Sequence, residues 1–245
     1  MKEAIIRLIE KEKLIVIVRG VEEDALIPLA EAMYEGGVRL LELTYDASGK
    51  KTDQEIARNI AMLSAHFKDR MWIGAGTVLK EEQVHLTKAA GGHFVISPDV
   101  NPAVIQTTNG MGMVSIPGAL TPTEAQMAHR SGADFVKLFP MDALGPAYLK
   151  AIRAPLSHIR FLAVGGIDET NIAAYAKAGV CGFGIGSNIV RKELLANKDY
   201  VALRLLAEQY VKAVEMRGCK RKHETCIFVA WYLFFDTIYD KMYLK

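Results

Sequence analysis

The residue whose position points most directly to chemistry is Lys137, in the predicted strand DFVKLFP (134–140). Side chains alternate along a strand, so Lys137 shares one face with Phe135 and Phe139. If that face is buried, burial and nearby cations lower the pKa of the lysine, which leaves part of it as the neutral amine that attacks a carbonyl. The alternative is structural, with Lys137 held as the ion-pair partner of Glu42.

Glu42 is the carboxylate best suited to work beside that lysine. It lies in the predicted strand RLLELT (39–44), on the same face as Thr44. A buried carboxylate needs a partner, and Lys137 and Arg19 are the candidates. Beside a reactive lysine, Glu42 would act as a general acid and base. In the structural alternative, it only balances the charge of the lysine.

Two glycine-containing turns suggest a site for phosphate. Gly165 and Gly166 end one predicted strand, and Gly186 and Ser187 end the next. Glycine lets backbone N–H groups approach an anion, the Ser187 hydroxyl can donate, and a short helix expected from about Asn188 would add its positive end. The alternative interpretation is a pair of tight turns that bind nothing.

Eight β-rich segments alternate with amphipathic helical segments, and this alternation positions the residues above. The predicted strands cover residues 14–20, 39–44, 72–77, 93–97, 113–118, 134–140, 160–166 and 181–187. The pattern is typical of an α/β fold, a single (β/α)8 TIM barrel, with an N-terminal helix over roughly residues 2–12 that caps the barrel bottom. An open doubly wound sheet is the runner-up, but its glycine-rich dinucleotide fingerprint after the first strand is absent.

Further candidate site residues follow from this fold, because the active site of a TIM barrel forms where the strands end. Arg19 ends the first predicted strand, Thr77 the third and Pro98 follows the fourth. The helices carry signals of their own. Asn101-Pro102 predicts a helix start, and Gly179 predicts a helix end.

The composition narrows the classes of function. The chain has 245 residues and a net charge of +2 with acids and bases interspersed, which argues against a nucleic-acid or membrane-surface partner. No apolar run reaches the roughly 20 residues that span a bilayer. The charged N-terminus lacks a signal segment, and three cysteines without metal-type spacing indicate free thiols in a reducing cytoplasm. Six scattered histidines predict no metal site.

The C-terminal segment differs from the rest of the chain. We predict a barrel domain over residues 1–217 and a separate extension over 218–245, which holds seven aromatic residues. Its apolar run, residues 227–235, is too short to span a membrane. It either packs on the barrel or on a neighbouring subunit, or it is a non-native extension such as a frameshift product. We assign it no function.

Eight segments resemble, in their order and spacing, the 2-keto-3-deoxy-6-phosphogluconate (KDPG)/4-hydroxy-2-oxoglutarate (KHG) aldolase family. The segments are IVIVRG, GGVRLLELT, IGAGTVL, FVISP, IPGALTPTEA, FVKLFP, VGGI and GIGS, and they span most of residues 1–217. The resemblance implies a class I, metal-independent carbon–carbon lyase without cofactor, in which Lys137 forms a Schiff base and Glu42 is the acid and base. It implies a pyruvate pocket lined by Thr77, Pro98 and Phe139, and a site for the distal end of the substrate, phosphate included, formed by Arg19, Gly165, Gly166 and Ser187.

The implied reaction is the cleavage of a 2-keto-3-deoxy-6-phospho sugar acid, or of 4-hydroxy-2-oxoglutarate, to pyruvate and an aldehyde. The aldehyde would be glyceraldehyde 3-phosphate or glyoxylate. The partners implied are this small-molecule substrate and two further copies of the chain in a homotrimer.

Two positions depart from the family pattern and affect substrate choice. Asp46 stands where many members carry an arginine that contacts the substrate, and an acid there would repel an anion. Val164 replaces the threonine of the gluconate-type enzymes and removes a hydroxyl donor, which is closer to the 6-phosphogalactonate branch. The alternatives are therefore a 2-keto-3-deoxy-6-phosphogalactonate aldolase, a sugar-phosphate isomerase or epimerase that needs no imine, and a non-catalytic sugar-phosphate-binding barrel.

Overall fold

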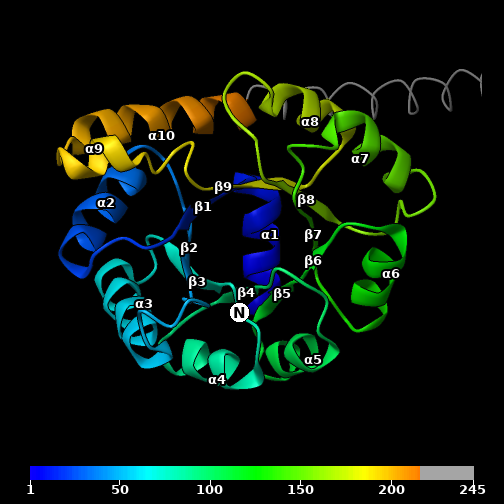
Figure 1. The fold of residues 1–245 in the computed structure, drawn as a ribbon, viewed down its shortest axis with the longest axis horizontal. Coiled ribbons are helices and arrows are strands. Elements are labelled where there is room, and N and C mark those ends of the chain that lie inside the picture. The colour runs from blue at the N-terminus through cyan, green and yellow to red at the C-terminus, as the bar shows by residue number, and fades with distance from the viewer. Residues whose placement is uncertain (216–245) are drawn as a thin grey trace, which may run out of the picture. The chain divides into compact units, whose positions relative to one another are not determined.

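Strands and helices alternate along the chain and form a barrel in the computed structural model, which describes residues 1–215 (Figure 1). All strand pairs are parallel, in the order β5-β4-β3-β2-β1-β9-β8-β7-β6. The strands are β1 (Leu14–Val18), β2 (Leu40–Thr44), β3 (Trp72–Gly76), β4 (Phe94–Ile96), β5 (Val114–Ile116), β6 (Gly118–Ala119), β7 (Val136–Leu138), β8 (Phe161–Val164) and β9 (Gly182–Ile185). The helices are α1 (Lys2–Glu12), α2 (Glu23–Glu35), α3 (Asp53–Phe67), α4 (Glu81–Ala89), α5 (Pro102–Gly110), α6 (Pro122–Arg130), α7 (Gly145–Arg153), α8 (Ile172–Ala178), α9 (Lys192–Ala196) and α10 (Tyr200–Glu215).

The fifth predicted strand, 113–118, is two strands in the structure, because Pro117 interrupts it. β5 pairs with β4, whereas β6 pairs with β7. Proline has no backbone N–H to give to a ladder, but the Pro117 carbonyl accepts a hydrogen bond from Lys137 N at 2.9 Å. The two short strands thus bond to opposite neighbours and close the sheet. The predicted (β/α)8 barrel is confirmed, with nine strands where eight were expected.

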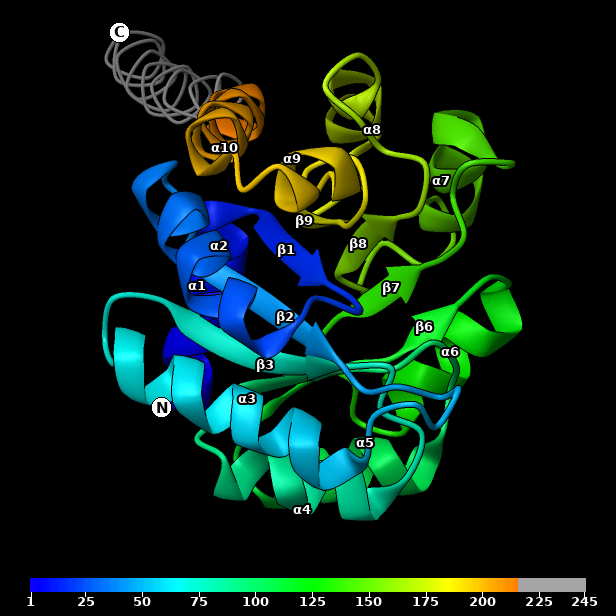
Figure 2. The same cartoon turned by 60° about the vertical axis from the view of Figure 1, so that its left-hand side comes forward.

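Helix α1 closes the end of the barrel at which the strands begin, as predicted. Figure 2 shows the strand arrows pointing away from α1. Ile5 and Ile9 are buried in one cluster with side chains of the strands, Ile15, Leu40, Phe94, Val114 and Leu162, and with Phe135, which directly precedes β7. Lys2 Nζ fixes the start of the helix by an ion pair with Asp134 at 2.9 Å. The opposite end of the barrel, where the strands end, is left for the site.

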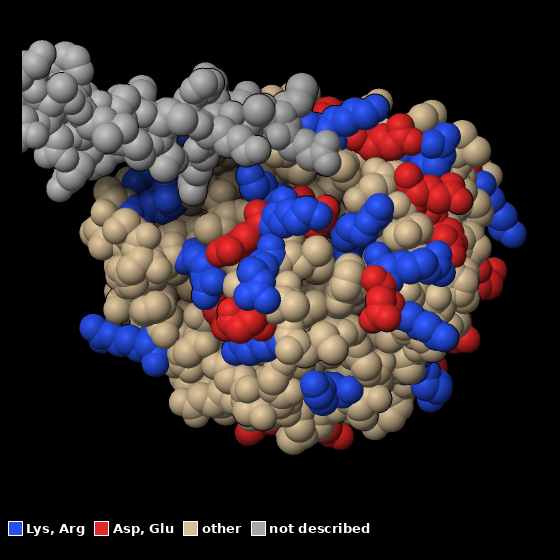
Figure 3. All heavy atoms as spheres, turned by 180° about the vertical axis from the view of Figure 1, so that it is seen from behind, with Lys and Arg blue, Asp and Glu red and all other residues tan. Residues whose placement is uncertain are grey.

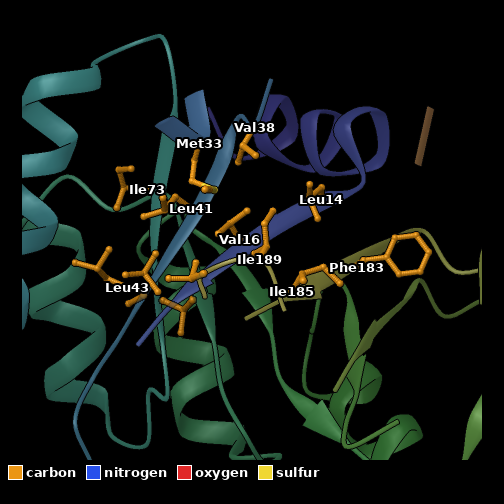
Figure 4. Close-up of a cluster of buried hydrophobic side chains, with 14 of the residues drawn as sticks. Leu14, Val16, Met33, Val38, Leu41, Leu43, Ile73, Phe183, Ile185 and Ile189 are labelled. Atoms are coloured by element: carbon orange, nitrogen blue, oxygen red, sulfur yellow. The ribbon is translucent and has the colours of Figure 1, made fainter. Parts of the chain in front are cut away.

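The main core lies between the strands and the surrounding helices. On β2, Leu41 and Leu43 point outward to this layer, where Met33 of α2 and Ile73 of β3 join them (Figure 4). Alternation along the strand then sends Glu42 inward. The apolar packing of the outward residues therefore fixes the orientation of the polar residues in the barrel.

The helix signals in the sequence correspond to caps in the structure. Asn101 caps α5 by accepting a hydrogen bond from Ala103 N at 3.0 Å, with Pro102 as the first helical residue. Gly179 ends α8 with a left-handed backbone, φ 93°. These caps set where each helix begins and ends between consecutive strands.

The face of the molecule that carries α1 has a mixed charge. In Figure 3, Lys and Arg side chains alternate with Asp and Glu side chains over that face, and no patch of a single sign extends across it. On α1 itself, Glu10 forms an ion pair with Arg160 at 3.5 Å. This face therefore offers no basic surface of the kind that binds a polyanion.

Residues Met1–Val214 form one compact unit. The boundary expected at residue 217 and the extension expected over 218–245 lie outside the described residues. No helix in the part of the chain that the structure describes is long and apolar enough to cross a membrane.

Candidate active site

Two buried charged side chains face each other across the barrel. Glu42, on β2, is 3% exposed, and Lys137, on β7, is 8% exposed. Among residues 1–214, for which burial is described, no other Asp, Glu, Lys or Arg is buried to this degree. Burying a charge without a compensating partner is costly, so two such residues in one barrel indicate a functional requirement rather than packing.

The amine of Lys137 lies against an aromatic ring. Its Nζ is 4.9 Å from the centre of the Phe139 ring. Burial lowers the pKa of Lys137, the positive charge of Arg19 lowers it further, and the carboxylates of Glu42 and Asp99 act in the opposite direction. Within the described residues, Nζ forms no hydrogen bond or ion pair, so the contact ion pair with Glu42 that the structural alternative requires is not formed.

The pKa of the Glu42 carboxyl group is raised, whereas that of Lys137 is lowered, so both shifts favour the neutral forms. Burial raises the pKa of Glu42 to about 7, although the nearby charges of Lys137 and Arg19 lower it. Its Oε2 is buried and has no hydrogen-bond partner among the described residues. A carboxyl with a pKa near 7 can both release and accept a proton at neutral pH, as a general acid and base must.

Glycines on β3 make room for the carboxylate, which sequence reasoning missed. A Cβ at Gly76 would lie 1.5 Å from Glu42 Oε1, and one at Gly74 would lie 2.3 Å from the Phe94 ring. Any side chain at position 76 would therefore displace the Glu42 carboxyl group. The signal that was available is the pair of glycines two residues apart inside a predicted strand, which places both on the inner face.

Arg19 and Thr77 meet at the ends of β1 and β3. Arg19 Nη2 donates a hydrogen bond to Thr77 Oγ1 at 3.3 Å. Thr77 has a φ of 55°, in a region that a β-branched residue rarely adopts. Such a backbone costs of the order of 1–3 kcal/mol and is concentrated at functional sites. The turn after β3 is therefore held in a conformation that directs the Thr77 hydroxyl toward Arg19.

Pro98 packs against the residue of β6 that pairs with Lys137, and Phe139 contacts Lys137 itself. Gly118 of β6 pairs in register with Lys137. A Cβ at Gly118 would lie 2.3 Å from the Pro98 carbonyl oxygen, so the chain after β4 packs directly against this neighbour. Phe139 is 38% exposed, and its ring is in contact with the lysine amine.

Gly165 and Gly166 adopt left-handed backbones, with φ of 98° and 66°. A Cβ at Gly166 would lie 2.3 Å from Asp142 Cβ, and one at Gly165 would lie 3.2 Å from Met141 N. The tight-turn interpretation thus has a geometric basis, since both glycines allow the loop after β7 to pack closely. Their own N–H groups donate to no described residue, so they also remain free for an anion.

Gly186 and Ser187 lie at the end of β9 and line a cavity of about 900 Å³ together with Arg19. The prediction of a short helix from about Asn188 is wrong. Residues 187–190 form a turn, in which Ile189 N and Val190 N donate to the Gly186 carbonyl, and α9 begins only at Lys192. The turn is tethered instead by the Asn188 side chain, whose Nδ2 donates to Ile167 O at 2.8 Å. This bond holds the two glycine turns side by side.

Asp46 is engaged within its own loop. Its Oδ1 accepts hydrogen bonds from Ser48 N at 2.9 Å and Ser48 Oγ at 2.6 Å, and its Oδ2 accepts one from Lys51 N at 3.0 Å. These bonds lower the pKa of Asp46 to about 2. The carboxylate therefore shapes the loop after β2, as an Asx turn does.

Metal ligands do not gather in the described part of the chain. Residues 1–215 contain no group of three or more His, Cys, Asp or Glu side chains that could hold an ion. Of the histidines, His66 bonds to Glu31, and His129 packs on His158 with ring centres 4.8 Å apart. These contacts are of the kind expected for surface residues.

Comparisons with known proteins converge on one family. The family model "KDPG and KHG aldolase" matches residues 5–206. A probable 2-dehydro-3-deoxy-6-phosphogalactonate aldolase of Rhizobium meliloti is 38% identical over 184 residues, 75% of this chain and 84% of its own. The 2-dehydro-3-deoxy-6-phosphogalactonate aldolase of Escherichia coli is 33% identical over 206 residues, 84% of this chain and 98% of its own.

A solved structure matches the barrel as well. The KDPG aldolase of Legionella pneumophila, with pyruvate captured as a covalent carbinolamine intermediate, superposes with a TM-score of 0.74. It is 29% identical, and the match covers 83% of this chain and 96% of that one. The sequence and structure comparisons thus indicate the same family, and each covers most of the chain.

Proposed function

The chain belongs to the KDPG and KHG aldolase family, and we propose that Lys137 is its Schiff-base nucleophile and Glu42 its general acid and base. The protein is an aldolase, a carbon–carbon lyase. It cleaves a 2-keto-3-deoxy-6-phospho sugar acid or 4-hydroxy-2-oxoglutarate to pyruvate and an aldehyde. The assignment of individual residues is our proposal.

The observation that carries this assignment is the state of the two buried charges. Lys137 and Glu42 face each other in the barrel, are not joined by a contact ion pair, and each has a pKa shifted toward its neutral form. A lysine must be neutral to attack a carbonyl, and a carboxyl near pKa 7 can shuttle a proton. An ion pair built for stability would favour the charged forms of both groups.

The proposed reaction begins when neutral Lys137 Nζ attacks the C2 carbonyl of the substrate. The resulting carbinolamine loses water and becomes a protonated imine. The Glu42 carboxylate removes the proton of the C4 hydroxyl, directly or through a water molecule, and the C3–C4 bond breaks. Its electron pair moves into the imine to give an enamine, and the aldehyde leaves. Protonation of the enamine at C3 and hydrolysis of the imine release pyruvate and restore neutral Lys137.

The remaining residues form the proposed substrate site. Thr77, Pro98 and Phe139 would hold the pyruvate part; the support is that the Phe139 ring centre lies 4.9 Å from Lys137 Nζ and that Pro98 packs on Gly118, the register partner of Lys137. Arg19 and the free N–H groups at the two glycine turns, Gly165, Gly166, Gly186 and Ser187, would hold the distal phosphate. The support is that Arg19, Gly186 and Ser187 line one cavity and that Arg19 also bonds to Thr77.

For the substrate, we favour the 6-phosphogalactonate epimer. Val164 is buried and its Cγ2 would lie 2.8 Å from a Cβ at Gly184, so it offers an apolar group where a threonine would offer a hydroxyl. Both sequence relatives described above carry the 6-phosphogalactonate name. Retro-aldol assays on the gluconate, galactonate and hydroxy-oxoglutarate substrates test this choice. A higher kcat/KM for the galactonate epimer supports it, and a preference for the gluconate epimer refutes it.

We also propose that the reaction needs neither a metal nor an organic cofactor, because the imine accepts the electrons that a metal would otherwise stabilise. Activity that is unchanged after EDTA supports this, and activity that is lost to EDTA and restored by a divalent cation contradicts it. Assembly as a homotrimer and location in the cytoplasm stay predictions. An isomerase, an epimerase or a non-catalytic barrel would show no retro-aldol turnover in the same assays.

A further inference from the structure

The cavity beside Ser187 is lined by two lysines that the proposed mechanism does not use. It lies between the ends of β1 and β9, the start of α2, and α9, and its wall includes Lys192 and Lys198 together with Arg19 and Ser187. Figures 1 and 2 both place α9 beside α10 at this edge of the barrel. The cavity is therefore an outward continuation of the proposed phosphate end of the site.

Positively charged side chains outnumber negatively charged ones in the wall of this cavity. Its acids are Glu22 and Asp24, and Glu22 is already paired with Lys51 at 3.0 Å. Among the described residues, the ammonium groups of Lys192 and Lys198 form no hydrogen bond or ion pair. An excess of unpaired cations in a concave site attracts anions and raises their local concentration.

The groups near the proposed phosphate position differ in the charge that they can supply to it. Backbone N–H groups at the glycine turns would orient a phosphate but carry no net charge. Arg19 is shared, because it also bonds to Thr77 and lowers the pKa of Glu42 and Lys137. Lys192 and Lys198 have no second role of this kind among the described residues.

We propose that Lys192 and Lys198 are specificity-determining residues that select phosphorylated over unphosphorylated substrates by supplying positive charge to the terminal phosphate. This inference rests on the proposed function and adds two residues to it. A phosphate monoester is mostly a dianion above pH 6, so it gains more from two cations than a hydroxyl or a single carboxylate does. Because both lysines are exposed, each contributes modestly and the effect is screened by salt.

The kinetic test compares Lys192→Ala, Lys198→Ala and the double variant on two substrates, 2-keto-3-deoxy-6-phosphogalactonate and 4-hydroxy-2-oxoglutarate. We expect each single variant to raise KM for the phosphorylated substrate about 2- to 10-fold, with kcat nearly unchanged and with a smaller effect at high salt. KM for 4-hydroxy-2-oxoglutarate should stay the same. Lys192→Arg should restore the wild-type KM, and Lys177→Ala, at an exposed position near the end of α8, serves as the control. Equal changes for both substrates, or none, would overturn the proposal.

A binding experiment separates this inference from the proposed function. Inorganic phosphate is titrated into the wild type and the double variant, and trapping of pyruvate by borohydride is measured on the same samples. Weaker phosphate binding in the double variant with unchanged trapping supports the inference. Unchanged phosphate binding overturns it. An absence of trapping in the wild type would contradict the role of Lys137 and leave the phosphate result to be judged separately.

Discussion

At the scale of single residues, the site is defined by two ionisable groups that burial pushes toward neutrality. Lys137 and Glu42 occupy opposite strands, and each carries a pKa shift whose largest cause is burial. The protein therefore gives up stability to keep them there, because the charged form of each is disfavoured inside the barrel. That cost is itself a measurable quantity.

The first prediction concerns Glu42→Gln and the pH dependence of stability. The pKa of Glu42 is raised from 4.5 to about 7, so its contribution to stability is fully present below pH 4.5 and is lost as the pH rises through 7. Glutamine has no such loss. The free energy of unfolding of Glu42→Gln should therefore rise relative to wild type by roughly 1–3 kcal/mol between pH 4.5 and pH 8.

Denaturant titrations at the two pH values measure this difference. Glu3→Gln, at an exposed position of α1, is the matched control and should show no such change. The same Glu42→Gln protein should lose about 100- to 10,000-fold in kcat, because the amide cannot accept the substrate proton. A variant that keeps both wild-type turnover and the wild-type pH profile would contradict the role of Glu42.

At the scale of elements, β3 determines whether the carboxylate fits. Ala at position 76 would place a methyl group on the Glu42 carboxyl oxygen, since the Cβ site is 1.5 Å from Oε1. We expect Gly76→Ala to lower kcat more than 100-fold and to cost about 1–3 kcal/mol of stability, through overpacking.

Gly110→Ala is the control for this second prediction. Position 110 ends α5, and no atom lies within 4 Å of its Cβ site. Steady-state kinetics and thermal melts of both variants decide the matter. Wild-type kcat in a folded Gly76→Ala protein would show that the Glu42 carboxyl group is not required where the structure places it.

The third prediction concerns Asp46, in the loop after β2. An acid at this position was expected to repel an anionic substrate, yet its oxygens are occupied by Ser48 and by Lys51 N. Asp46→Ala removes the acceptor for these donors and should loosen the loop. We expect no gain in affinity for a phosphorylated substrate, and a measurable loss of stability.

Kinetics on 2-keto-3-deoxy-6-phosphogalactonate and a denaturant titration measure both effects. Asp46→Asn keeps one acceptor oxygen and should retain most of the stability, which makes it the matched comparison. A tenfold fall in KM for either variant would mean that repulsion, and not loop structure, is the main effect of the acid.

At the scale of the whole molecule, the sequence predicted the barrel because its signals are local and repeated. Alternation in each strand predicted which residues share a face with Glu42 and with Lys137, and caps such as Asn101 were visible as short motifs. The split at Pro117 was missed because it depends on which neighbour each half-strand meets when the barrel closes. The turn at Asn188 was missed for a similar reason, since its Nδ2 is held by Ile167 O from another loop.

For the site residues too, local sequence signals could be read from the sequence, whereas contacts between distant segments could not. The period alone indicated which strand residues share a face, but the packing of the outer core decides which face points inward, and the need for glycine at position 76 depends on a side chain 34 positions earlier in the sequence. The partners of Asp46 depend on how its loop folds back. Such contacts are properties of the tertiary structure, and no window of the sequence contains them.

The fourth prediction is the homotrimer. Three chains of 27.0 kDa each would give a particle of about 81 kDa. Light scattering on the purified chain of 245 residues measures this mass directly. A particle of 27.0 kDa that shows full retro-aldol activity would contradict the expected assembly, and the activity would then be a property of the single barrel.

Imine formation at Lys137 can be detected by trapping the imine with a reductant. The protein is incubated with pyruvate, sodium borohydride is added, and the modified residue is located by peptide mass spectrometry. We expect irreversible loss of activity and a reduced pyruvate adduct on Lys137, with no adduct in Lys137→Ala and none without pyruvate. An adduct on another lysine, or no adduct in an active protein, would contradict the role proposed for Lys137.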